Sequence, residues 1–398
     1  LFIKMKKIIS ILGSTGSIGL STLKICSKKK NLFKINILAA NKNYKLISSQ
    51  IKIFKPEIFI IKDQVIYKKV KKRFKYNKVK IFQSVNIKNK YFKYSDITVA
   101  AIPGIAGLHS TLEMIKKSKK ILIANKESVI CGWNLIKKIA SKNNTKIVPV
   151  DSEHFSIMQL LKNHKLEDIE KVYLTASGGP FLKYSQSKFK NIKPKDAIKH
   201  PKWKMGKKIS IDSASLMNKM LELIEAHKLF SIHPSKIEIV IHPESLVHAI
   251  IKLKNGLYKF IYHETTMIIP IVNAIFDGNL KIDDFIKPNF KNKKIFFFKN
   301  LNFLNIDKKK FPLVNLKSRL NEYSSTPIII NAANEILVDQ FLKKKISFIS
   351  FYRHLFKVLN DRNYKKYAIK EPRNIKQILL IDKWARNTTY RKLKFKNA

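Results

Sequence analysis

The feature that most constrains this chain is a glycine-rich loop, ILGSTGSIG, with glycines at positions 13, 16 and 19. The β-branched run KIISIL precedes the loop, and the helix-like run SIGLSTLKICSK follows it. Glycines between a strand and a helix permit a tight turn in which backbone N–H groups approach a pyrophosphate at the helix N-terminus. The loop therefore predicts a dinucleotide-binding unit, although its GxxGxxG spacing differs from the common GxGxxG pattern.

The alternation of strand and helix continues to about residue 150. Runs rich in β-branched residues predict five further strands, at residues 34–40, 57–63, 96–102, 119–125 and 145–150. Helical stretches separate several of these runs, and such alternation indicates a parallel sheet with helices on both faces. We therefore expect an α/β chain whose residues 1–150 form an NADPH-binding, Rossmann-like domain.

The regular alternation of strands and helices ends after residue 150. Strands of a second sheet are predicted within 171–181 and 236–253, and an apolar period predicts one long helix over 213–230. We expect 151–280 to form an α+β catalytic domain with a mobile flap at about 200–207. Residues 281–312 are rich in Lys, Asn and Phe and predict a linker, and 313–398 predict a C-terminal helical bundle.

The charge of the chain is strongly positive, with 80 Lys and Arg against 27 Asp and Glu and a formal net charge of +53. Such a charge balance is typical of proteins that bind nucleic acid, anionic lipid or an acidic substrate. Lysines are spread along the whole chain together with Ile, Asn and Phe, so we favour compositional drift over a selected polyanion surface. The densest run, residues 67–80, is interpreted as an exposed helix or edge strand rather than a nucleic-acid site.

Two cysteines and the lack of long apolar runs bear on location. Cys26 and Cys131 cannot form a disulfide framework, which fits a reducing compartment. The apolar run IISIL is shorter than the ~7–15 residues of a signal-peptide core, and no run approaches the ~18 residues of a membrane helix. We expect a soluble, cytoplasmic protein without a membrane or nucleic-acid partner.

The end of the second predicted strand indicates which nicotinamide cofactor is used. NAD-specific folds carry an acid there that binds the ribose 2′-OH, but this chain has AANKN, residues 39–43. Lys42 and Asn43 could bind a 2′-phosphate, so the sequence predicts NADP(H). The competing interpretation is a solvated lysine in a lysine-rich chain.

Two scarce carboxylates follow a strand in VPVDSEHF, at Asp151 and Glu153. A third acid, Glu222, lies on a predicted helix, where Asn218 and Lys219 share its face at helical spacing. Three carboxylates would favour Mg²⁺ or Mn²⁺ over zinc. The alternative is an ordinary surface pair between Lys219 and Glu222, and Glu225 is interpreted as a similar surface acid.

Small polar residues near these acids predict an anion pocket. Ser177 stands in the Gly-rich run TASGGP, whose turn can present backbone donors to an anion. Together with Ser213, Asn218 and Lys219 it would make a pocket for a phosphate monoester.

At this point the chain resembles the 1-deoxy-D-xylulose 5-phosphate reductoisomerase family. The resemblance extends from about residue 7 to 345 and is carried by LGSTGSIG, AAIPGIAGL, ILIANKES, PVDSEH, LTASGGPF, HPKWKMGKKISIDSASLMNKMLELIEA, IHPESLVHAII and NAANE. It implies an NADPH- and divalent-metal-dependent enzyme that rearranges and reduces 1-deoxy-D-xylulose 5-phosphate to 2-C-methyl-D-erythritol 4-phosphate. It also implies a homodimer and Mg²⁺, Mn²⁺ or Co²⁺ as the metal.

The resemblance implies a set of cofactor contacts around the glycine loop and two later strand ends: Gly13, Thr15, Gly16, Ser17, Ile18, Asn41, Lys42, Asn43, Asn125, Glu127 and Gly206. Asp151, Glu153 and Glu222 resemble the metal ligands, and together with Lys126 they form the expected catalytic set. His154 is expected beside the metal ligands rather than among them.

The substrate contacts that the resemblance implies come from several motifs: Lys126, Ser152, Glu153, Ser177, His200, Trp203, Ser213, Asn218, Lys219 and Glu222. Trp203 would close over the substrate as part of the flap, with Met205 packed nearby, and Ser245 would be a further neighbour. A structural role before Pro201 is the competing interpretation of His200.

Two places depart from the family pattern. Asn41 stands where the family usually has glycine, and the loop TTMIIPI at 265–271 replaces a run that resembles DMRTPI. Both places border the expected cofactor.

Two other classes of function compete with this one. An ordinary NADP dehydrogenase of small hydroxy acids or alcohols would need no site of three carboxylates. A polyanion-binding protein would be supported by charge alone.

Overall fold

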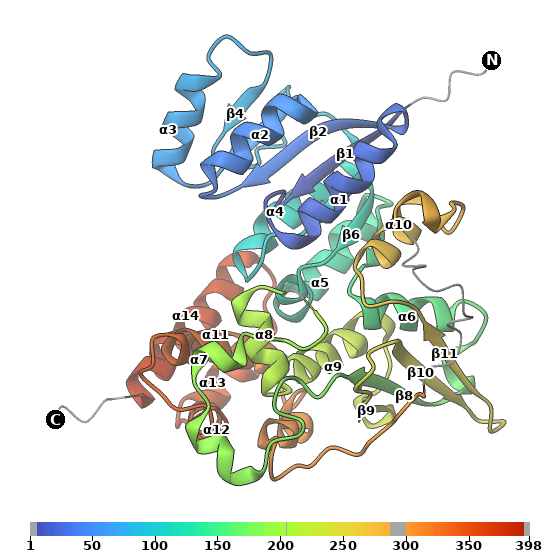
Figure 1. Cartoon of the computed structure of the whole chain (residues 1–398). Helices are drawn as coiled ribbons and strands as arrows, with labels where there is room; N and C mark the ends of the chain where they lie inside the picture. Colours follow the sequence, from blue (N-terminus) through green and yellow to red (C-terminus); the bar gives the residue numbers. More distant parts are fainter. Residues whose placement is uncertain (1–5, 204, 287–299, 394–398) are drawn as a thin grey trace. The chain divides into compact units, whose positions relative to one another are not determined.

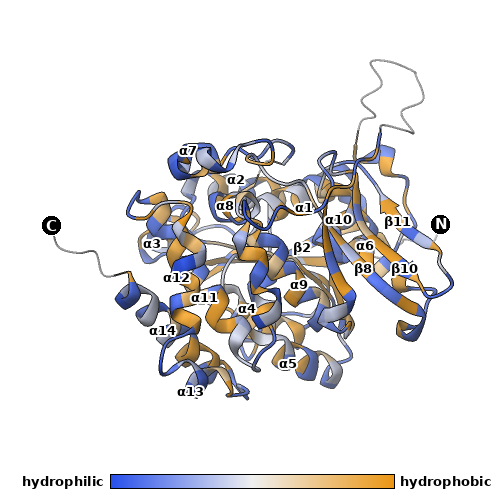
Figure 2. Cartoon of the chain, turned by 90° about the horizontal axis from the view of Figure 1, so that it is seen from below, coloured by the Kyte–Doolittle hydropathy of each residue, from blue (hydrophilic) through white to orange (hydrophobic). Residues whose placement is uncertain are grey.

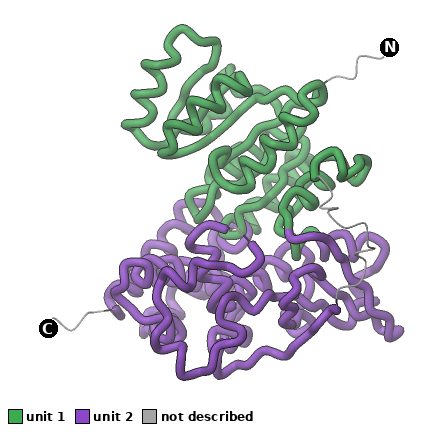
Figure 3. Tube along the Cα trace, in the orientation of Figure 1, with its two compact units in different colours: residues 1–128, 133–155, 266–294 green, residues 129–132, 156–265, 295–398 purple. Residues whose placement is uncertain are grey.

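The computed structural model describes residues 6–203, 205–286 and 300–393. The chain divides into two compact units (Figure 3): unit 1 holds residues 1–128, 133–155 and 266–294, and unit 2 holds 129–132, 156–265 and 295–398. Part of the predicted linker, residues 287–299, lies outside the described residues, as does position 204 of the predicted flap. The domain boundaries drawn from the sequence stay a prediction.

Unit 1 is built on a seven-stranded sheet in the order β4-β3-β2-β1-β5-β6-β7 (Figure 1). Every neighbouring pair in it is parallel. The strands are β1 (Lys7–Leu12), β2 (Phe33–Ala40), β3 (Ile58–Ile61), β4 (Lys80–Phe82), β5 (Ser95–Ala100), β6 (Ser118–Ile123) and β7 (Lys146–Pro149). The predicted α/β class and its Rossmann-like parallel sheet are confirmed.

The central strands of this sheet are apolar along nearly their whole length. Both faces of a parallel sheet are covered by crossover helices, so its strands read as continuous β-branched runs rather than alternating ones. All four residues of β3 are buried, and six of the eight residues of β2 are buried as well. The helices of unit 1 are α1 (Ser17–Lys28), α2 (Tyr44–Phe54), α3 (Gln64–Arg73), α4 (Ala106–Ile115), α5 (Lys126–Lys142) and α10 (Ile268–Phe276).

The lysine-rich run at 67–80 falls in α3 and ends at the edge strand β4. Val70 is the single buried residue of α3, and the Lys and Arg side chains of this helix are exposed. Both halves of the sequence interpretation, an exposed helix and an edge strand, are therefore realised in one segment.

Unit 2 contains a four-stranded sheet in the order β11-β10-β8-β9. The pair β8–β9 is parallel, whereas β10 pairs antiparallel with both β8 and β11. Its strands are β8 (Ile169–Ala176), β9 (Ile237–Ile241), β10 (Val247–Leu253) and β11 (Tyr258–Tyr262). Figure 2 shows hydrophobic and hydrophilic residues along β8 and β10, as expected for a sheet with one face toward a core.

The single long helix predicted over 213–230 is wrong. The segment forms α8 (Lys207–Ala214) and α9 (Met217–Phe230), separated by Leu216, which has a left-handed φ of 59°. The Ser215 hydroxyl donates to the Ile211 carbonyl at 3.0 Å and ends α8. Leu216 is only 1% exposed, so tertiary burial outweighs the roughly 1–2 kcal/mol that a left-handed conformation costs an ordinary residue.

The C-terminal part of unit 2 is helical, as predicted. Helices α11 (Thr326–Leu342), α12 (Ser350–Leu359) and α14 (Ile375–Lys392) pack on one another, with α13 (Tyr364–Ala368) beside them (Figure 1). Arg386 of α14 binds Asp382 of its own helix at 2.7 Å and also reaches Glu335 of α11. The two carboxylates hold the guanidinium between the helices and raise the pKa of Arg386, although its burial acts against this. None of the described helices has both the length and the apolar composition needed to cross a membrane.

Candidate active site

The glycine loop between β1 and α1 is shaped to receive an anion. Gly13 has a φ of +89°, and a Cβ there would lie 2.5 Å from the Ala101 carbonyl oxygen of the neighbouring β5 end. The amides of Gly13 and Ser14 donate to the Ala39 carbonyl at 2.9 and 2.8 Å, which ties the loop to β2. No side chain caps the N-terminus of α1, and Gly16 and Ser17 are exposed there. The predicted phosphate contacts at Thr15, Gly16, Ser17 and Ile18 therefore lie on an uncapped helix start, at the point where the strand order reverses.

The end of β2 supplies the next predicted cofactor contacts. Asn41, Lys42 and Asn43 are all exposed and lead directly into α2. The Asn43 side-chain oxygen accepts from the Leu46 amide at 3.1 Å, so Asn43 caps the helix and keeps its amide N–H groups for another partner. No acid stands at this strand end, in agreement with a cofactor that carries a 2′-phosphate.

The start of α5 places three predicted residues in succession. Asn125 caps α5 by accepting from the Ser128 amide at 2.5 Å, and it donates to the carbonyls of Ile102 and Gly104. Its side-chain amide is thus engaged with the backbone of two neighbouring segments. Lys126 and Glu127 are also buried, at 7% and 5% exposure.

The end of β7 places the first two predicted acids beside Lys126. Strands β6 and β7 are parallel neighbours, so the segments that follow them emerge at the same edge of the sheet. Lys126 Nζ lies 3.3 Å from Asp151 Oδ2, and the Ser152 hydroxyl donates to Glu153 Oε2 at 2.7 Å as α6 (Ser152–Leu161) begins. The lysine and Asp151 therefore form an ion pair that only the tertiary structure creates.

A second group of predicted residues follows β8 in unit 2. The Ser177 Oγ accepts from the Gly179 amide at 3.1 Å and lies 2.9 Å from His200 Nε2. His200 Nδ1 accepts from the backbone amides of Lys202 and Trp203 at 3.2 and 3.0 Å. Because Nδ1 is an acceptor, neutral His200 carries its proton on Nε2 and donates it to Ser177.

The protonation of His200 is shifted by its surroundings. Burial lowers the pKa of His200 from 6.5 to about 4, and the nearby positive charge of Lys219 acts in the same direction. At neutral pH the ring is therefore uncharged. The Ser177 oxygen already accepts two hydrogen bonds, so its own hydroxyl proton can be donated to an acceptor such as a phosphate oxygen.

The Gly-rich turn after β8 packs against the end of α8. Gly178 and Gly179 have φ values of +78° and +66°, and a Cβ on Gly179 would lie 3.0 Å from both the Ser213 carbonyl oxygen and the Ala214 Cα. Ser177 and Ser213 are thus brought to neighbouring positions from segments far apart in the sequence. The four residues of the predicted phosphate pocket, Ser177, Ser213, Asn218 and Lys219, all belong to unit 2.

The first turns of α9 carry the remaining polar residues. Asn218 donates to Glu222 Oε1, and Lys219 Nζ lies 2.5 Å from Glu222 Oε2, as the helical spacing predicts. Glu222 is 1% exposed, so the alternative of a surface pair is wrong. Every residue from 217 to 226 is buried, including Glu225 at 4% exposure, so the expectation of Glu225 as a surface acid is wrong as well.

The segment 200–206 is tied to its surroundings at both ends. Trp203 meets the His248 ring edge-on, with 6.2 Å between centroids. Gly206 is the N-cap of α8 and has nothing within 4 Å of the position a Cβ would take. The flap itself stays a prediction.

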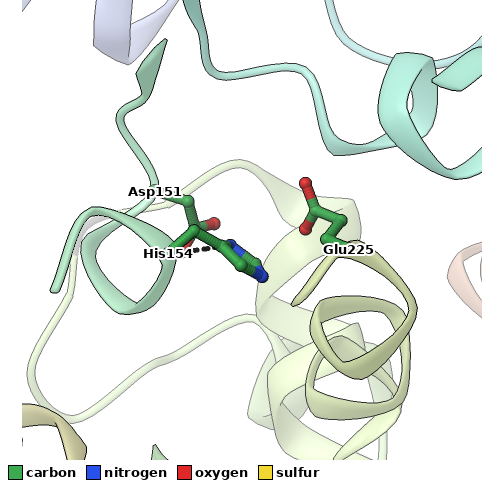
Figure 4. A group of neighbouring side chains, drawn as sticks. All are labelled: Asp151, His154 and Glu225. Carbon is green, nitrogen blue, oxygen red and sulfur yellow. Dashed lines mark ion pairs between the residues drawn. The ribbon is translucent and has the colours of Figure 1, made fainter. Parts of the chain in front are cut away.

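Two groups of side chains have the chemical composition of a cation site. One is Asp151, Glu153 and Glu222, and the other is Asp151, His154 and Glu225, which Figure 4 draws. The first group is all oxygen and suits Mg²⁺ or Mn²⁺, whereas the imidazole of the second suits softer metals. The two groups share the Asp151 carboxylate, and His154 Nδ1 lies 3.8 Å from Asp151 Oδ1.

Sequence reasoning missed Glu225 as a member of this cluster. The available signal was its position three residues after Glu222, which puts both acids on one side of a helix. His154 likewise follows Asp151 by three residues at the start of α6. Spacing alone does not specify whether either side chain is exposed or buried.

Comparison with known proteins places this geometry in context. Residues 9–132 match the family profile of 1-deoxy-D-xylulose 5-phosphate reductoisomerase, residues 147–230 match the profile of its C-terminal domain, and residues 264–388 match that of the DXP reductoisomerase C-terminal domain. A 1-deoxy-D-xylulose 5-phosphate reductoisomerase of Pelagibacter ubique is 48% identical over 378 residues, which cover 94% of this chain and 96% of the relative. One from Wolbachia of Drosophila simulans is 43% identical and covers 87% of this chain and 88% of the relative.

Solved structures are similar over nearly the whole chain. A DOX-P reductoisomerase in complex with NADPH, fosmidomycin and magnesium has a TM-score of 0.88 at 33% identity and covers 98% of each chain. The Zymomonas mobilis reductoisomerase in complex with NADPH has a TM-score of 0.85 at 31% identity and covers 98% of this chain and 100% of its own.

Proposed function

The chain belongs to the 1-deoxy-D-xylulose 5-phosphate reductoisomerase family, and from this premise we propose which of its residues carry the reaction. The activity is the NADPH- and divalent-metal-dependent rearrangement and reduction of 1-deoxy-D-xylulose 5-phosphate to 2-C-methyl-D-erythritol 4-phosphate, on the non-mevalonate route to isoprenoids. The proposal rests chiefly on three carboxylates, Asp151, Glu153 and Glu222, in a chain with few acids.

Asp151, Glu153 and Glu222 hold the divalent ion. Their donor set is all oxygen, which fits Mg²⁺ or Mn²⁺. When bound, the ion supplies Lewis-acid polarisation of substrate oxygens. Asn218 and Lys219 orient the Glu222 carboxylate by donating to both of its oxygens, and Ser152 does the same for Glu153.

Ser177, Ser213, Asn218 and Lys219 bind the substrate phosphate. Lys219 supplies a positive charge, and neutral His200 fixes the Ser177 hydroxyl so that its proton points to a phosphate oxygen. The phosphate does not react, so its binding energy is available for alignment of the carbon skeleton and for closure of the flap. Trp203 then covers the substrate and excludes water from the reactive intermediates.

Lys126 acts on the reacting end of the substrate. Asp151 holds its ammonium group at 3.3 Å, and a buried ammonium in that position can orient or protonate a substrate oxygen. The loops after β1 and β2 would hold NADPH, through Gly13, Thr15, Gly16, Ser17, Ile18, Asn41, Lys42 and Asn43, and Asn125, Glu127 and Gly206 would border it. NADPH supplies the hydride for the reduction.

We also propose a homodimer in the cytoplasm. Cys26 and Cys131 are both buried and neither is part of a disulfide, which is in keeping with a reducing compartment. Light scattering of the purified protein gives the mass directly, and one chain is 46.3 kDa. A monomeric mass at micromolar concentration contradicts the dimer.

The deciding experiment follows NADPH oxidation with 1-deoxy-D-xylulose 5-phosphate in the presence and absence of Mg²⁺ or Mn²⁺. The wild type is expected to depend on the metal. Glu222→Gln is expected to lower kcat/KM by at least about a hundredfold, because the bound ion supplies several kcal/mol of stabilisation. Metal-independent turnover, or an unimpaired Glu222→Gln, refutes the assignment.

Glu225→Gln is the matched control. It makes the same change one helical turn away and belongs to the second possible group of ligands rather than the first. We expect it to keep the wild-type dependence on Mg²⁺ concentration, whereas Glu222→Gln shifts it upward. The reverse result assigns the ion to Asp151, His154 and Glu225.

A further inference from the structure

Two cations of α3 are gathered on the first residue of α2. The Tyr44 Oη accepts from Arg73 Nη1 at 3.0 Å, and Lys69 Nζ lies 4.4 Å from the centroid of the Tyr44 ring. The Arg73 guanidinium carbon is also within 5.6 Å of that ring. Tyr44 therefore positions two positive charges that would otherwise be free to spread along an exposed helix.

This cluster lies next to the strand end where a dinucleotide fold recognises the adenosine ribose. Tyr44 follows Asn43, the cap of α2, and β2 ends four residues earlier without an acid. Helices α2 and α3 pack on each other, and Figure 1 shows both beside β2 and β4. The Lys69 and Arg73 side chains thus reach from α3 to Tyr44, the residue that directly follows the loop 41–43.

The loop itself provides little positive charge for a dianionic 2′-phosphate. Asn43 uses its side-chain oxygen as the helix cap, and Asn41 is neutral. Lys42 is the single cation of the loop. The one acid at the start of α3, Asp63, accepts from the amides of Val65 and Ile66 and is engaged as the cap of its helix.

The lowered pKa of Tyr44 reflects the positive electrostatic potential that Lys69 and Arg73 create around it. The hydrogen bond from Arg73 lowers the pKa of the Tyr44 phenol, and the charges of Arg73 and Lys69 add to this effect. The field at the Tyr44 oxygen favours a negative charge there. A phosphate beside this oxygen would experience the same field.

We propose that Lys69 and Arg73, positioned by Tyr44, bind the 2′-phosphate of NADPH and select NADPH over NADH. The inference rests on the proposed function, because it concerns the cofactor of that reaction. It assigns to α3 a specificity role that neither the glycine loop nor the residues 41–43 supply. The charges act by direct contact with one phosphate, so their effect must vanish for a cofactor that lacks it.

The test is the dissociation constant of NADPH and of NADH, measured by cofactor fluorescence and by calorimetry without substrate. For Lys69→Gln with Arg73→Gln we expect about tenfold weaker NADPH binding, the change that about 1.4 kcal/mol of charge-assisted contact supports, and NADH affinity within about twofold of wild type. Tyr44→Phe keeps both cations but removes the anchor of Arg73, so we expect a smaller loss, about threefold, for NADPH alone.

Lys72→Gln is the matched control. It removes one charge from an exposed position of the same helix. Equal weakening of NADPH and NADH, an effect of Lys72→Gln as large as that of the double variant, or unchanged NADPH affinity of the double variant each overturns the inference. If the wild type binds no NADPH, the proposed function itself fails, which is a distinguishable result.

Discussion

Acidification tests the role assigned to His200. The folded protein holds this ring uncharged, because burial and the Lys219 charge lower its pKa from 6.5 to about 4. In the unfolded chain the ring takes up a proton near its ordinary value. Between pH 6.5 and about 4 the unfolded state therefore binds more protons than the folded state, and stability falls as the pH falls. Above pH 6.5 this group makes no contribution.

The size of the effect follows from the two pKa values. A drop from 6.5 to about 4 corresponds to about 3 kcal/mol at 1.36 kcal/mol per pKa unit. His200 is only partly buried, so solvent screening reduces this figure, and we expect about 1–2 kcal/mol of stability to be lost by pH 4. A loss of this size is a measurable fraction of the stability of a typical domain.

The assay compares thermal and urea unfolding from pH 7 to 4 for wild type and His200→Gln. Glutamine cannot titrate, and its side-chain N–H can still donate to Ser177, so the variant should lose less stability over this range. His109→Gln replaces an exposed histidine of α4 and controls for the loss of a ring elsewhere.

Nitrogen NMR of the labelled His200 ring gives an independent measurement. We expect the Nε2–H tautomer at neutral pH, because Nδ1 accepts from two backbone amides. A ring that titrates near 6.5, an Nδ1–H tautomer, or identical pH profiles for wild type and His200→Gln refutes the reasoning.

Three further predictions follow from local geometry. Gly13→Ala should lower the free energy of unfolding by more than about 2 kcal/mol and abolish NADPH binding, because φ is +89° and the new Cβ would lie 2.5 Å from the Ala101 carbonyl oxygen. Gly206→Ala places its Cβ in open space and should leave the free energy of unfolding within about 0.5 kcal/mol of wild type. Chemical denaturation checks both. Ser231→Gly should stabilise the protein by about 0.5–1 kcal/mol, because Ser231 ends α9 at a φ of 56°; an unchanged or lower melting temperature contradicts this. The Cys26 thiol should resist alkylation at pH 8 until the protein unfolds, because burial raises its pKa to about 12; rapid labelling of the native protein would disprove it.

Much of unit 1 could be predicted because its signals are local. The glycine loop, the predicted helix over 17–28 and the continuous apolar strands each follow from neighbouring residues, and the structure places α1 at Ser17–Lys28. The same holds for Asn218, Lys219 and Glu222, which meet because helical spacing brings them together. In these cases backbone geometry alone fixes the contact.

The failures share a different physical cause. The break at Leu216 depends on burial of that side chain and on packing of the Gly179 turn against α8, which no local pattern encodes. The prediction of Glu225 as a surface acid fails because periodicity describes one face of a helix, whereas residues 217–226 of α9 are buried on every face. Burial of a whole helix is decided by what packs around it.

The amino-acid sequence by itself determined the parallel sheet, the glycine-rich turn after its first strand, the absence of an acid at the end of β2, and the family. Only the tertiary structure decided that Lys126 pairs with Asp151, that His200 donates through Nε2 to Ser177, and that two cations of α3 contact Tyr44. The first set arises from residues a few positions apart, whose geometry the backbone dictates. The second arises from side chains brought together by packing of separate segments, where the energy of a contact depends on distances that spacing along the chain does not specify.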